Sequence, residues 1–596
     1  MEVDIPHAQY TRRAATSAGR ARDLARRERQ ISSSRLVVFG LGVVLAWLAF
    51  DAGWFSPWWL LLPVAAFVTL IVVHDSVIRA RRRRERVAAF YERGLARLED
   101  RWIGTGETGE RFIDEHHPYA ADLDLFGKGS LFELLSTART RAGEESLARW
   151  LQTPAPPNVV RARQAAIDEL RPRLDLREDL SVMGTELRAG LEPTALVAWA
   201  TMPATFAITW ARAAALAIVV LLIVTLVVSI LAGAGPIPLL IVLAIEIAFA
   251  AAIRHHVHNI IHGAERPTRD LGLLVEILAR LEPERFTAPM LAALRSALDV
   301  EGEPPSRQIA RLRRRVDLLD ARRNQMFAPI AALLLWGTQC ALAIEAWRRR
   351  SGAAIPRWIE AIGELEALSA LAGYSFEHPA DPFPEIVEGG PLFDSAELGH
   401  PLIPESRSVR NDVRLDGTLR LLVVSGSNMS GKSTLLRTIG TNTVLALAGG
   451  PVRATCLRLS PLAVGASLRI VDSLQTGTSH FYAEVKRLRQ LVDITGGPSP
   501  LLFLLDEILH GTNSHDRRIG AEAVVRELVE RGAIGLVTTH DLALASMVET
   551  LAPRAANVHF EDHLEDGKMV FDYRMRAGVV TKSNALALMR AVGLQV

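Results

Sequence analysis

Two long apolar runs near the start of the chain form its first clear pattern. One covers residues 36–50 and the other covers residues 58–73, and the turn Asp51-Ala-Gly-Trp-Phe-Ser-Pro57 separates them. Each run approaches the length that a helix needs to cross a bilayer once the flanking tryptophans are counted. The pattern therefore predicts a transmembrane helical hairpin over residues 36–73.

The charges around this hairpin predict its orientation. Arginines precede the first run and follow the second, whereas the turn contains neither Lys nor Arg. These arginines are Arg26, Arg27, Arg29, Arg35, Arg79, Arg81, Arg82, Arg83, Arg84 and Arg86. Because basic flanks are retained in the cytoplasm, both ends of the hairpin are expected there. The alternative is a buried hairpin in a soluble core, which the belt of Trp54, Trp58 and Trp59 disfavours.

A second apolar pair lies in the middle of the chain. Residues 213–231 and 237–253 are joined by a turn rich in Gly and Pro, with Arg212 and Arg254 at the outer ends. They predict a second transmembrane hairpin with cytoplasmic ends, and so four spans in all. Glu246 interrupts its second helix. A carboxyl at that depth is either a functional group or a protonated or helix-paired side chain with no transport role.

A third run, residues 326–347, is less uniformly apolar. It contains Pro329, Thr338 and Gln339, and it carries Glu345. A fifth span would place the C-terminal region of the chain on the opposite side of the membrane from the Arg-rich N-terminus. This run is therefore expected to form a buried core helix.

These patterns divide the chain into consecutive segments. We expect a basic cytoplasmic tail (1–35), a first transmembrane hairpin (36–73), a helical linker (74–121), the first section of a helical core (122–204), a second transmembrane hairpin (205–255), the second section of the helical core, or lever (256–388), and a C-terminal α/β domain (389–596).

Composition adds few constraints. The chain has 596 residues, which is too long for a single hydrophobic core. At roughly 150 residues per domain, this length suggests three or four units. The 68 basic and 66 acidic side chains leave a net charge of +2, so the overall charge does not indicate a nucleic-acid partner. A local basic groove remains possible.

Cys340 and Cys456 lie far apart, which predicts neither a disulfide framework nor a zinc site. His258 and His262 are one helical turn apart but lack an acidic or Cys partner nearby, which favours an interfacial position over a metal site.

From about Gly389 the chain alternates short strand-like runs with helices, which is typical of a largely parallel sheet. The run Leu419–Ser425 leads into Gly426-Ser-Asn-Met-Ser-Gly-Lys-Ser-Thr434, a complete G-x-x-x-x-G-K-[ST] motif that opens a helix. Backbone N–H groups of such a loop close around phosphates, Lys432 should reach the β and γ phosphates, and Ser433 should hold Mg²⁺. The predicted ATP-binding residues here are Gly426, Ser427, Asn428, Met429, Ser430, Gly431, Lys432, Ser433 and Thr434.

A second buried run, residues 501–505, ends in two carboxylates. Asp506 is expected to join the Mg²⁺ coordination shell, and Glu507 to act as the general base on the attacking water. A third apolar run ends at Thr539 and is followed by His540, which is expected to sense or orient the γ-phosphate. Glu507 and His540 are thus the predicted catalytic pair, with Ser433 and Asp506 as the predicted metal ligands.

The loop Ser425–Thr434 resembles the P-loop of the MutS mismatch-repair family, including its Asn428-Met429 pair. Further stretches agree with that family, and they are Asp472-Ser-Leu-Gln-Thr-Gly-Thr-Ser-His-Phe-Tyr-Ala-Glu484, Asp506-Glu-Ile-Leu-His-Gly-Thr-Asn-Ser-His-Asp516, Thr538-Thr-His540, Asn557-Val-His559 and Lys582-Ser-Asn584. The resemblance covers about residues 395–595 and implies an ABC-type α/β P-loop ATPase domain with ATP and Mg²⁺ as cofactors. It also implies a homodimer through the ATPase domains, in which Ser479 reaches the partner's nucleotide.

The likeness continues upstream, where stretches within residues 122–151 resemble the start of the family's helical core, and it extends more weakly to Pro154, Arg163-Gln164 and Glu169-Leu170. Two departures matter. The short stretch between Arg84 and Asp122 leaves no room for a mismatch-reading domain, and the second hairpin stands where the family's DNA clamp should interrupt the core. DNA therefore stays open as a partner, but no preference for mismatches is expected.

The sequence thus predicts a MutS-like ATPase that couples an ATP-driven dimer rearrangement to an all-α, membrane-anchored core. The alternative is an ABC-type membrane transporter ATPase, which shares the P-loop, the acidic strand end and the histidine. That class predicts a Leu-Ser-Gly-Gly-Gln signature, whereas this chain has Gly477-Thr-Ser-His-Phe481. A tethered scaffold with an inactive nucleotide site would be expected to have lost Lys432 or Glu507, and both are present.

Overall fold

The computed structural model describes most of the chain. Outside the described residues lie 1–3, 188–192, 204–207, 234, 300–301, 321–326, 428, 469–479, 510–511, 541–544, 566–567 and 581–596. The chain forms two compact units. The first comprises residues 1–136, 150–178 and 371–596, and the second comprises residues 137–149 and 179–370.

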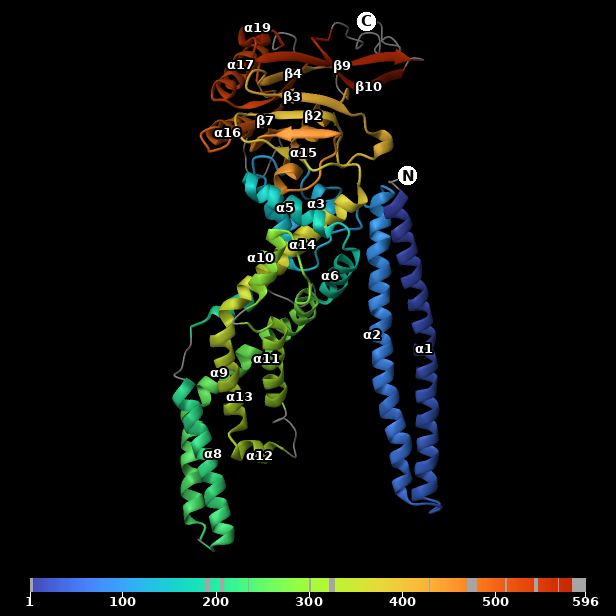
Figure 1. The fold of residues 1–596 in the computed structure, drawn as a ribbon, viewed down its shortest axis with the longest axis vertical. Coiled ribbons are helices and arrows are strands. Elements are labelled where there is room, and N and C mark those ends of the chain that lie inside the picture. Colours follow the sequence, from blue (N-terminus) through green and yellow to red (C-terminus); the bar gives the residue numbers. More distant parts are fainter. Residues whose placement is uncertain are drawn as a thin grey trace. The chain divides into compact units, whose positions relative to one another are not determined.

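The first unit begins with a long antiparallel helical hairpin (Figure 1). Helix α1 spans Asp4–Phe50 and helix α2 spans Leu61–Leu98, with the short 3₁₀ helix η1 at Pro57–Leu60 between them. Both helices extend well beyond the apolar runs inside them. The stretch expected as a basic tail is helical from Asp4 onward, because its Ala and Arg residues favour a helix and no breaker separates them from the apolar run.

The open end of this hairpin is held by a buried polar cluster. The Tyr10 side chain is almost fully buried, and its ring lies 5.5 Å from that of Tyr91. Its hydroxyl donates to Glu377 at 3.1 Å, and Arg97 Nε donates to the same carboxylate at 2.7 Å. The Glu377 side chain is therefore buried with its charge paired.

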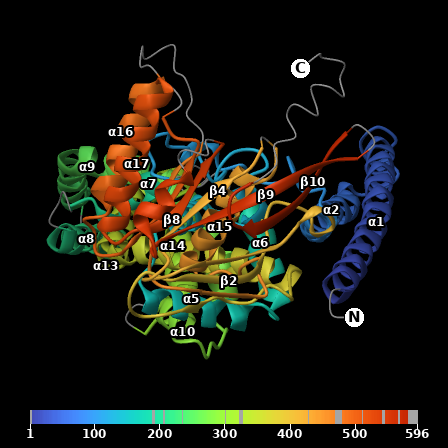
Figure 2. The same ribbon diagram turned by 90° about the horizontal axis from the view of Figure 1, so that it is seen from above.

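The C-terminal region of the first unit is built on a six-stranded sheet among the described residues. Its order is β10-β9-β4-β8-β7-β6. The bounds are β4 Leu421–Ser425, β6 Ala463–Ser467, β7 Leu501–Asp506, β8 Ile534–Thr539, β9 Ala555–Glu565 and β10 Lys568–Ala577. Strands β9, β4, β8, β7 and β6 run parallel to their neighbours, and β10 closes one edge as an antiparallel hairpin with β9 (Figure 2).

This sheet is apolar on both faces, as its continuous hydrophobic runs predict. All five residues of β4 and all six of β8 are buried. The flanking helices are α15 Lys432–Ala448, α16 His480–Ile494, α17 Ser514–Glu530 and α19 Met547–Leu551. Phe503 and Leu505 pack with Leu491, Val525 and Leu528 in one buried cluster, so α16 and α17 share a core with β7.

A smaller four-stranded sheet with the order β1-β5-β2-β3 lies in the same unit, counted over the described residues. Its bounds are β1 Glu385–Ile386, β2 Phe393–Leu398, β3 Asn411–Leu415 and β5 Cys456–Leu459. The other elements of the first unit are η2 Glu110–Phe112, α3 Leu131–Leu135, α5 Pro157–Leu170 and η5 Glu405–Arg407, and α4 Arg141–Gln152, α6 Leu174–Leu187 and α14 Ile355–Glu377 run through both units.

The structure divides the range 122–204 between the two units, although the sequence suggested one helical core. Residues 122–136 belong to the first unit. The Asp122 carboxylate accepts the backbone N–H of Leu468 at 2.7 Å, and Arg437 Nε donates to the Asp122 carbonyl at 3.2 Å. These bonds join the segment to α15 and to the end of β6.

The second unit is helical throughout its described residues. Its elements are α7 Pro193–Thr201, α8 Ile208–Leu231, α9 Ile237–Leu281, α10 Pro289–Leu298, α11 Pro305–Asp320, α12 Ala328–Leu333, α13 Trp336–Ser351 and η4 Gly352–Ala354. The run expected as one core helix over residues 326–347 is instead broken between α12 and α13. Leu335 at the break has a left-handed backbone with φ 46°, which ends one helix and redirects the next.

Four helices of the described chain are long and apolar enough to cross a membrane. They cover Ile5–Phe50, Pro57–Leu98, Trp210–Leu231 and Ile237–Gly272. Large apolar side chains on them are exposed, among them Phe39, Trp58, Val220 and Ile247. Their apolar faces are thus uncovered by protein, and the predicted transmembrane hairpins stay a prediction.

Candidate active site

The phosphate-binding loop connects the central strand β4 to helix α15. Gly426 directly follows the strand with φ 151°, and Gly431 precedes the helix with φ 104°. A Cβ at Gly426 would lie 2.8 Å from Ser430 Oγ, and a Cβ at Gly431 would lie 3.1 Å from Tyr573 Cδ1. Glycine is therefore required at both ends for the backbone to turn around an anion.

The loop carries unused hydrogen-bonding capacity. Lys432 Nζ donates to the carbonyls of Gly426 and Ser427, both at 2.9 Å. Within the described residues, the hydroxyls of Ser427 and Ser430 are buried without a hydrogen-bond partner. Because buried polar groups are normally satisfied, these hydroxyls indicate that the loop is shaped for a polar ligand.

The two carboxylates at the end of β7 are positioned by the neighbouring strand. The Thr538 hydroxyl on β8 donates to Asp506 Oδ1, and the oxygen of this hydroxyl accepts the Glu507 backbone N–H at 3.1 Å. Glu507 has φ 47°, an uncommon conformation for a residue other than glycine. The Glu507 side chain points toward the lysine of the P-loop.

Glu507 lies between two basic side chains. Its Oε1 is 3.6 Å from Lys432 Nζ and 3.4 Å from His540 Nδ1. Lys432 is buried, whereas about half of the His540 side chain is exposed. The structure therefore brings together the predicted phosphate-binding lysine, general base and histidine in one constellation.

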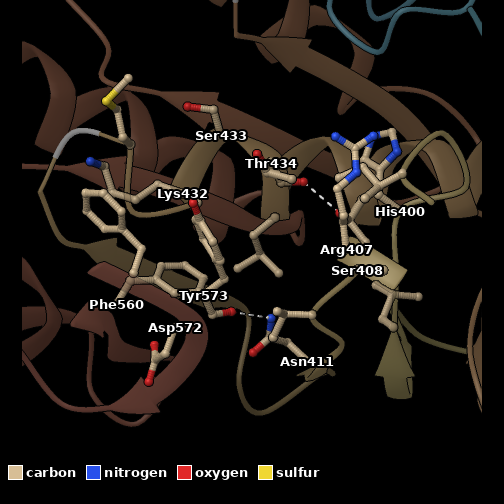
Figure 3. A pocket seen from close by; sticks show the side chains of 18 of the residues that line it. His400, Arg407, Ser408, Asn411, Lys432, Ser433, Thr434, Phe560, Asp572 and Tyr573 are labelled. Carbon is tan, nitrogen blue, oxygen red and sulfur yellow. Dashed lines mark hydrogen bonds between the residues drawn. The ribbon is translucent and has the colours of Figure 1, made fainter. Parts of the chain in front are cut away.

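Lys432 and Glu507 border a cavity of about 960 Å³ (Figure 3). Of the predicted site, the residues lining it are Met429, Gly431, Lys432, Ser433, Thr434, Asp506 and Glu507. Gly426, Ser427, Ser430 and His540 lie beside it but do not line it. Asn428 and Ser479 lie outside the described residues.

The opposite wall contains residues that the sequence motifs did not identify. Figure 3 shows Phe560 and Tyr573 near Lys432, with Arg407 and His400 across the pocket. Tyr573 has φ 55° and lies where the β9–β10 register shifts. Asn411 of β3 holds this irregular segment, since it donates to the Tyr573 carbonyl at 3.0 Å and accepts the Met575 N–H at 2.7 Å.

This wall offers a place for an aromatic or heterocyclic group. Phe560, Phe571 and Tyr573 all border the cavity, and aromatic rings stack on flat π-systems. His400 is buried in the same lining, and burial, reinforced by nearby Arg437, lowers its pKa to about 4. His400 is therefore neutral at physiological pH and adds no charge to the pocket.

The donor set fits a magnesium–nucleotide complex. Ser433 and Asp506, the predicted metal ligands, line the same cavity as Lys432. The described residues contain no group of three His, Cys, Asp or Glu side chains that could hold a metal by itself. Mg²⁺ commonly binds one or two protein oxygens together with phosphate oxygens and water, so this site suits Mg²⁺ that arrives with a nucleotide.

The role of Thr538 gives a testable expectation. Thr538→Val should lower the turnover rate about fivefold, because it removes the hydroxyl that joins Asp506 to the Glu507 backbone, and one such bond contributes on the order of 1 kcal/mol. Thr538→Ser retains the hydroxyl and should stay near wild type. Steady-state hydrolysis rates check this, with the melting temperature as a control for folding. A Val variant that is as active as the Ser variant would remove Thr538 from the site.

Comparison with known proteins agrees with this geometry. Residues 422–595 match the family model for MutS domain V. The chain is 32% identical to "Endonuclease MutS2" of Thermus thermophilus over 252 residues, which is 40% of this chain and 31% of that protein. It is 32% identical to "DNA mismatch repair protein MutS 2" of Halobacterium salinarum over 255 residues, or 41% of this chain and 29% of the relative.

A third relative, "DNA mismatch repair protein MutS" of Exiguobacterium sp., is 37% identical over 191 residues, or 31% of this chain and 22% of the relative. The matched region of the chain thus spans less than a third of the length of each of these relatives. The likeness is concentrated in one region of each protein, and it includes the P-loop and the acidic strand end described above.

Proposed function

Because the chain belongs to the MutS family, with domain V at its C-terminus after a helical region, we propose that it is a membrane-anchored ATPase. The observation that carries this proposal is the constellation of Lys432, Asp506 and Glu507 on one cavity, with Glu507 within 3.6 Å of the lysine. Phosphate binding, metal binding and water activation each have a residue of suitable chemistry there.

The loop and the lysine would bind the triphosphate. Phosphate oxygens would replace the carbonyls of Gly426 and Ser427 as acceptors for Lys432, and they would also accept bonds from the buried hydroxyls of Ser427 and Ser430. The positive end of the α15 dipole favours the same negative charge. The aromatic wall with Tyr573 would contact the base.

Hydrolysis needs a base that can face the γ-phosphate, and Glu507 meets this requirement. Once Lys432 pairs with the phosphate, the Glu507 carboxylate is released from its ion pair with this lysine. It can then accept a proton from the attacking water. The water oxygen then bonds to the γ-phosphorus while the bond to the bridging oxygen breaks, which leaves ADP and phosphate. Mg²⁺, held by Ser433 and Asp506, would neutralise charge on the phosphate oxygens.

His540 is suited to orient this base. Its Nδ1 lies 3.4 Å from Glu507 Oε1, and its ring is partly exposed at the end of β8. A histidine in this position can hold the carboxylate in one rotamer and can contact the γ-phosphate when the ring turns. We assign it a positioning role beside the base.

The membrane anchoring in this proposal rests on the exposed apolar helices. Two hairpins, α1–α2 and α8–α9, contain the four segments that are long and apolar enough to span a bilayer. The arginines beyond their ends favour an arrangement with both termini and the ATPase domain in the cytoplasm. A homodimer through the ATPase domains and contact with DNA phosphates complete the proposal. DNA is included because the names of two relatives refer to DNA mismatch repair.

The direct test is magnesium-dependent hydrolysis by the purified full-length chain. Phosphate release from ATP should require Mg²⁺ and should cease when EDTA removes it, then return when Mg²⁺ is restored in excess. Hydrolysis that is unchanged by EDTA would remove Ser433 and Asp506 as metal ligands. An absence of both nucleotide binding and hydrolysis in folded protein would overturn the proposed activity.

A further inference from the structure

The second unit contains a cavity that the ATPase activity does not use. It has a volume of about 590 Å³ and lies along α9, opposite α12 and the start of α13. Most of its lining is aliphatic, and the exceptions include Glu246 and Arg254. Cavities of this size, with apolar walls and a few polar groups, are the usual form of small-molecule sites.

Glu246 is the polar group inside this cavity. Only 4% of its surface is exposed, although it lies within one of the apolar helices long enough to span a membrane. Its Oε2 atom is buried and has no hydrogen-bond partner among the described residues. An unpaired carboxyl in apolar surroundings is costly, so this side chain is poised for a partner that the protein does not supply.

One wall of the cavity is fixed by the break between α12 and α13. Leu335 lines the cavity and keeps its left-handed backbone because its side chain packs with Ala215 and Val219 of α8. In Figure 1, α12 lies across the direction of α13 at this break. Ala332 and Leu333 of α12, together with Leu335 at the break, therefore form one wall of the cavity that contains Glu246.

Three further polar side chains of α9 lie toward one end of the cavity. Arg254, His258 and His262 line it at successive helical turns and are exposed. At 1.5 Å per residue, Arg254 is about 12 Å along the helix from Glu246, and His262 is about 24 Å away. The described residues hold no group of three metal-binding side chains, so the cavity is not assigned to a metal ion.

We propose that this cavity binds an amphipathic amine, with an apolar chain along α9 and an ammonium group on Glu246. An ammonium would supply the missing partner of Oε2 and neutralise the carboxylate. A hydrocarbon chain without a donor would leave the carboxyl unpaired, and an anionic group would repel it. The ligand enters from the bilayer, and this route rests on the proposed membrane insertion of α8 and α9.

The proposal is tested by photo-crosslinking of the full-length protein in phosphatidylcholine nanodiscs. The probe is a twelve-carbon alkylamine that carries a diazirine, and crosslinked peptides are located by mass spectrometry. Labelling of α9 and α12 should be competed by dodecylamine but not by dodecanol or dodecanoate. Glu246→Gln should reduce it at least about tenfold, since a neutral amide replaces the charged acceptor of a strong, charge-assisted hydrogen bond.

Two further variants keep the outcome clear. Glu276→Gln makes the same change on α9 outside the cavity and should label like wild type, whereas Ala251→Phe fills the cavity with Glu246 intact and should label poorly. Equal competition by dodecanol, or full labelling of Glu246→Gln, would overturn the proposal. Either result would mean that the cavity is filled by lipid chains without a role for the charge of Glu246. Repeating the experiment in detergent separates the two proposals, because the cavity should still bind the amine even if α8 and α9 prove not to span a membrane.

Discussion

Lys432→Ala is expected to weaken MgATP binding by about 100-fold. The lysine is buried against the loop carbonyls, and the phosphate oxygens that would replace them form charge-assisted bonds, which together contribute about 3 kcal/mol. Glu507→Gln should instead keep MgATP affinity within a few-fold of wild type and slow hydrolysis by roughly 10²–10⁴-fold, since a glutamine cannot accept the proton.

Equilibrium binding of a fluorescent ATP analogue and single-turnover phosphate release measure the two effects separately. Arg420→Ala is a suitable control, because this arginine lies at the far end of β4 and does not line the cavity. If Glu507→Gln hydrolyses ATP as fast as wild type, another group is the base. If both variants lose affinity equally, the separation of binding from water activation is wrong.

The second large effect concerns subunit complementation. Ser479→Ala and Lys432→Ala proteins should each be nearly inactive, because we propose, from the family resemblance, that Ser479 completes the partner's site. Co-expression should restore activity to at most about a quarter of wild type, since half of the dimers are mixed and half of the sites in them are whole. Distinct affinity tags on the two variants allow mixed dimers to be purified and assayed.

Proven mixed dimers that remain at the single-mutant level would show that Ser479 acts in its own subunit or that both sites must fire together. Full activity in a monomer would exclude the dimer requirement. A useful control is the mixture of Lys432→Ala with Glu507→Gln, because both changes lie in the same subunit's site. In these mixed dimers each site carries one of the two changes. The mixture should therefore stay at the single-mutant level.

Much of the C-terminal domain could be predicted from the sequence, because its strands and loops are specified by motifs of consecutive residues. A buried strand followed by a glycine-rich loop and a lysine has few structural solutions, and β4, the loop and α15 adopt the expected one. The domain V match confirms the predicted P-loop ATPase domain after a helical region. The position of Asp506 and Glu507 at the end of a buried strand could also be predicted, since an apolar run ends directly before them.

Other features depend on contacts between distant residues, and a local sequence pattern does not signal them. Tyr573 reaches the P-loop because the β9–β10 register shifts and because Asn411, from another sheet, bonds to the shifted segment. The residues around Tyr573 do not encode that contact by themselves. The break at Leu335 was likewise missed, because an aliphatic residue with a left-handed backbone is stabilised by its packing partners rather than by its own preference.

The helices of the first hairpin illustrate a different limit. The apolar runs locate its centre, but α1 begins at Asp4, well before the first run, because Ala and Arg favour a helix whether or not they face a membrane. The N-terminal part of α1 is then fixed by the hydrogen bond from Tyr10 to Glu377, which joins residues far apart in the chain. Hydropathy predicts where a helix is apolar, and it does not predict where that helix ends.

We propose that a MutS-type ATPase site facing the cytoplasm belongs to a chain that spans the membrane. The most direct measurement is MgATP hydrolysis by sealed inverted and right-side-out membrane vesicles, with vesicles containing the Glu507→Gln protein as background. We predict Glu507-dependent hydrolysis that sediments with the inverted vesicles and appears in right-side-out vesicles only after they are permeabilised. Activity that remains in the soluble fraction, or that is equal in both kinds of sealed vesicle, would contradict the account.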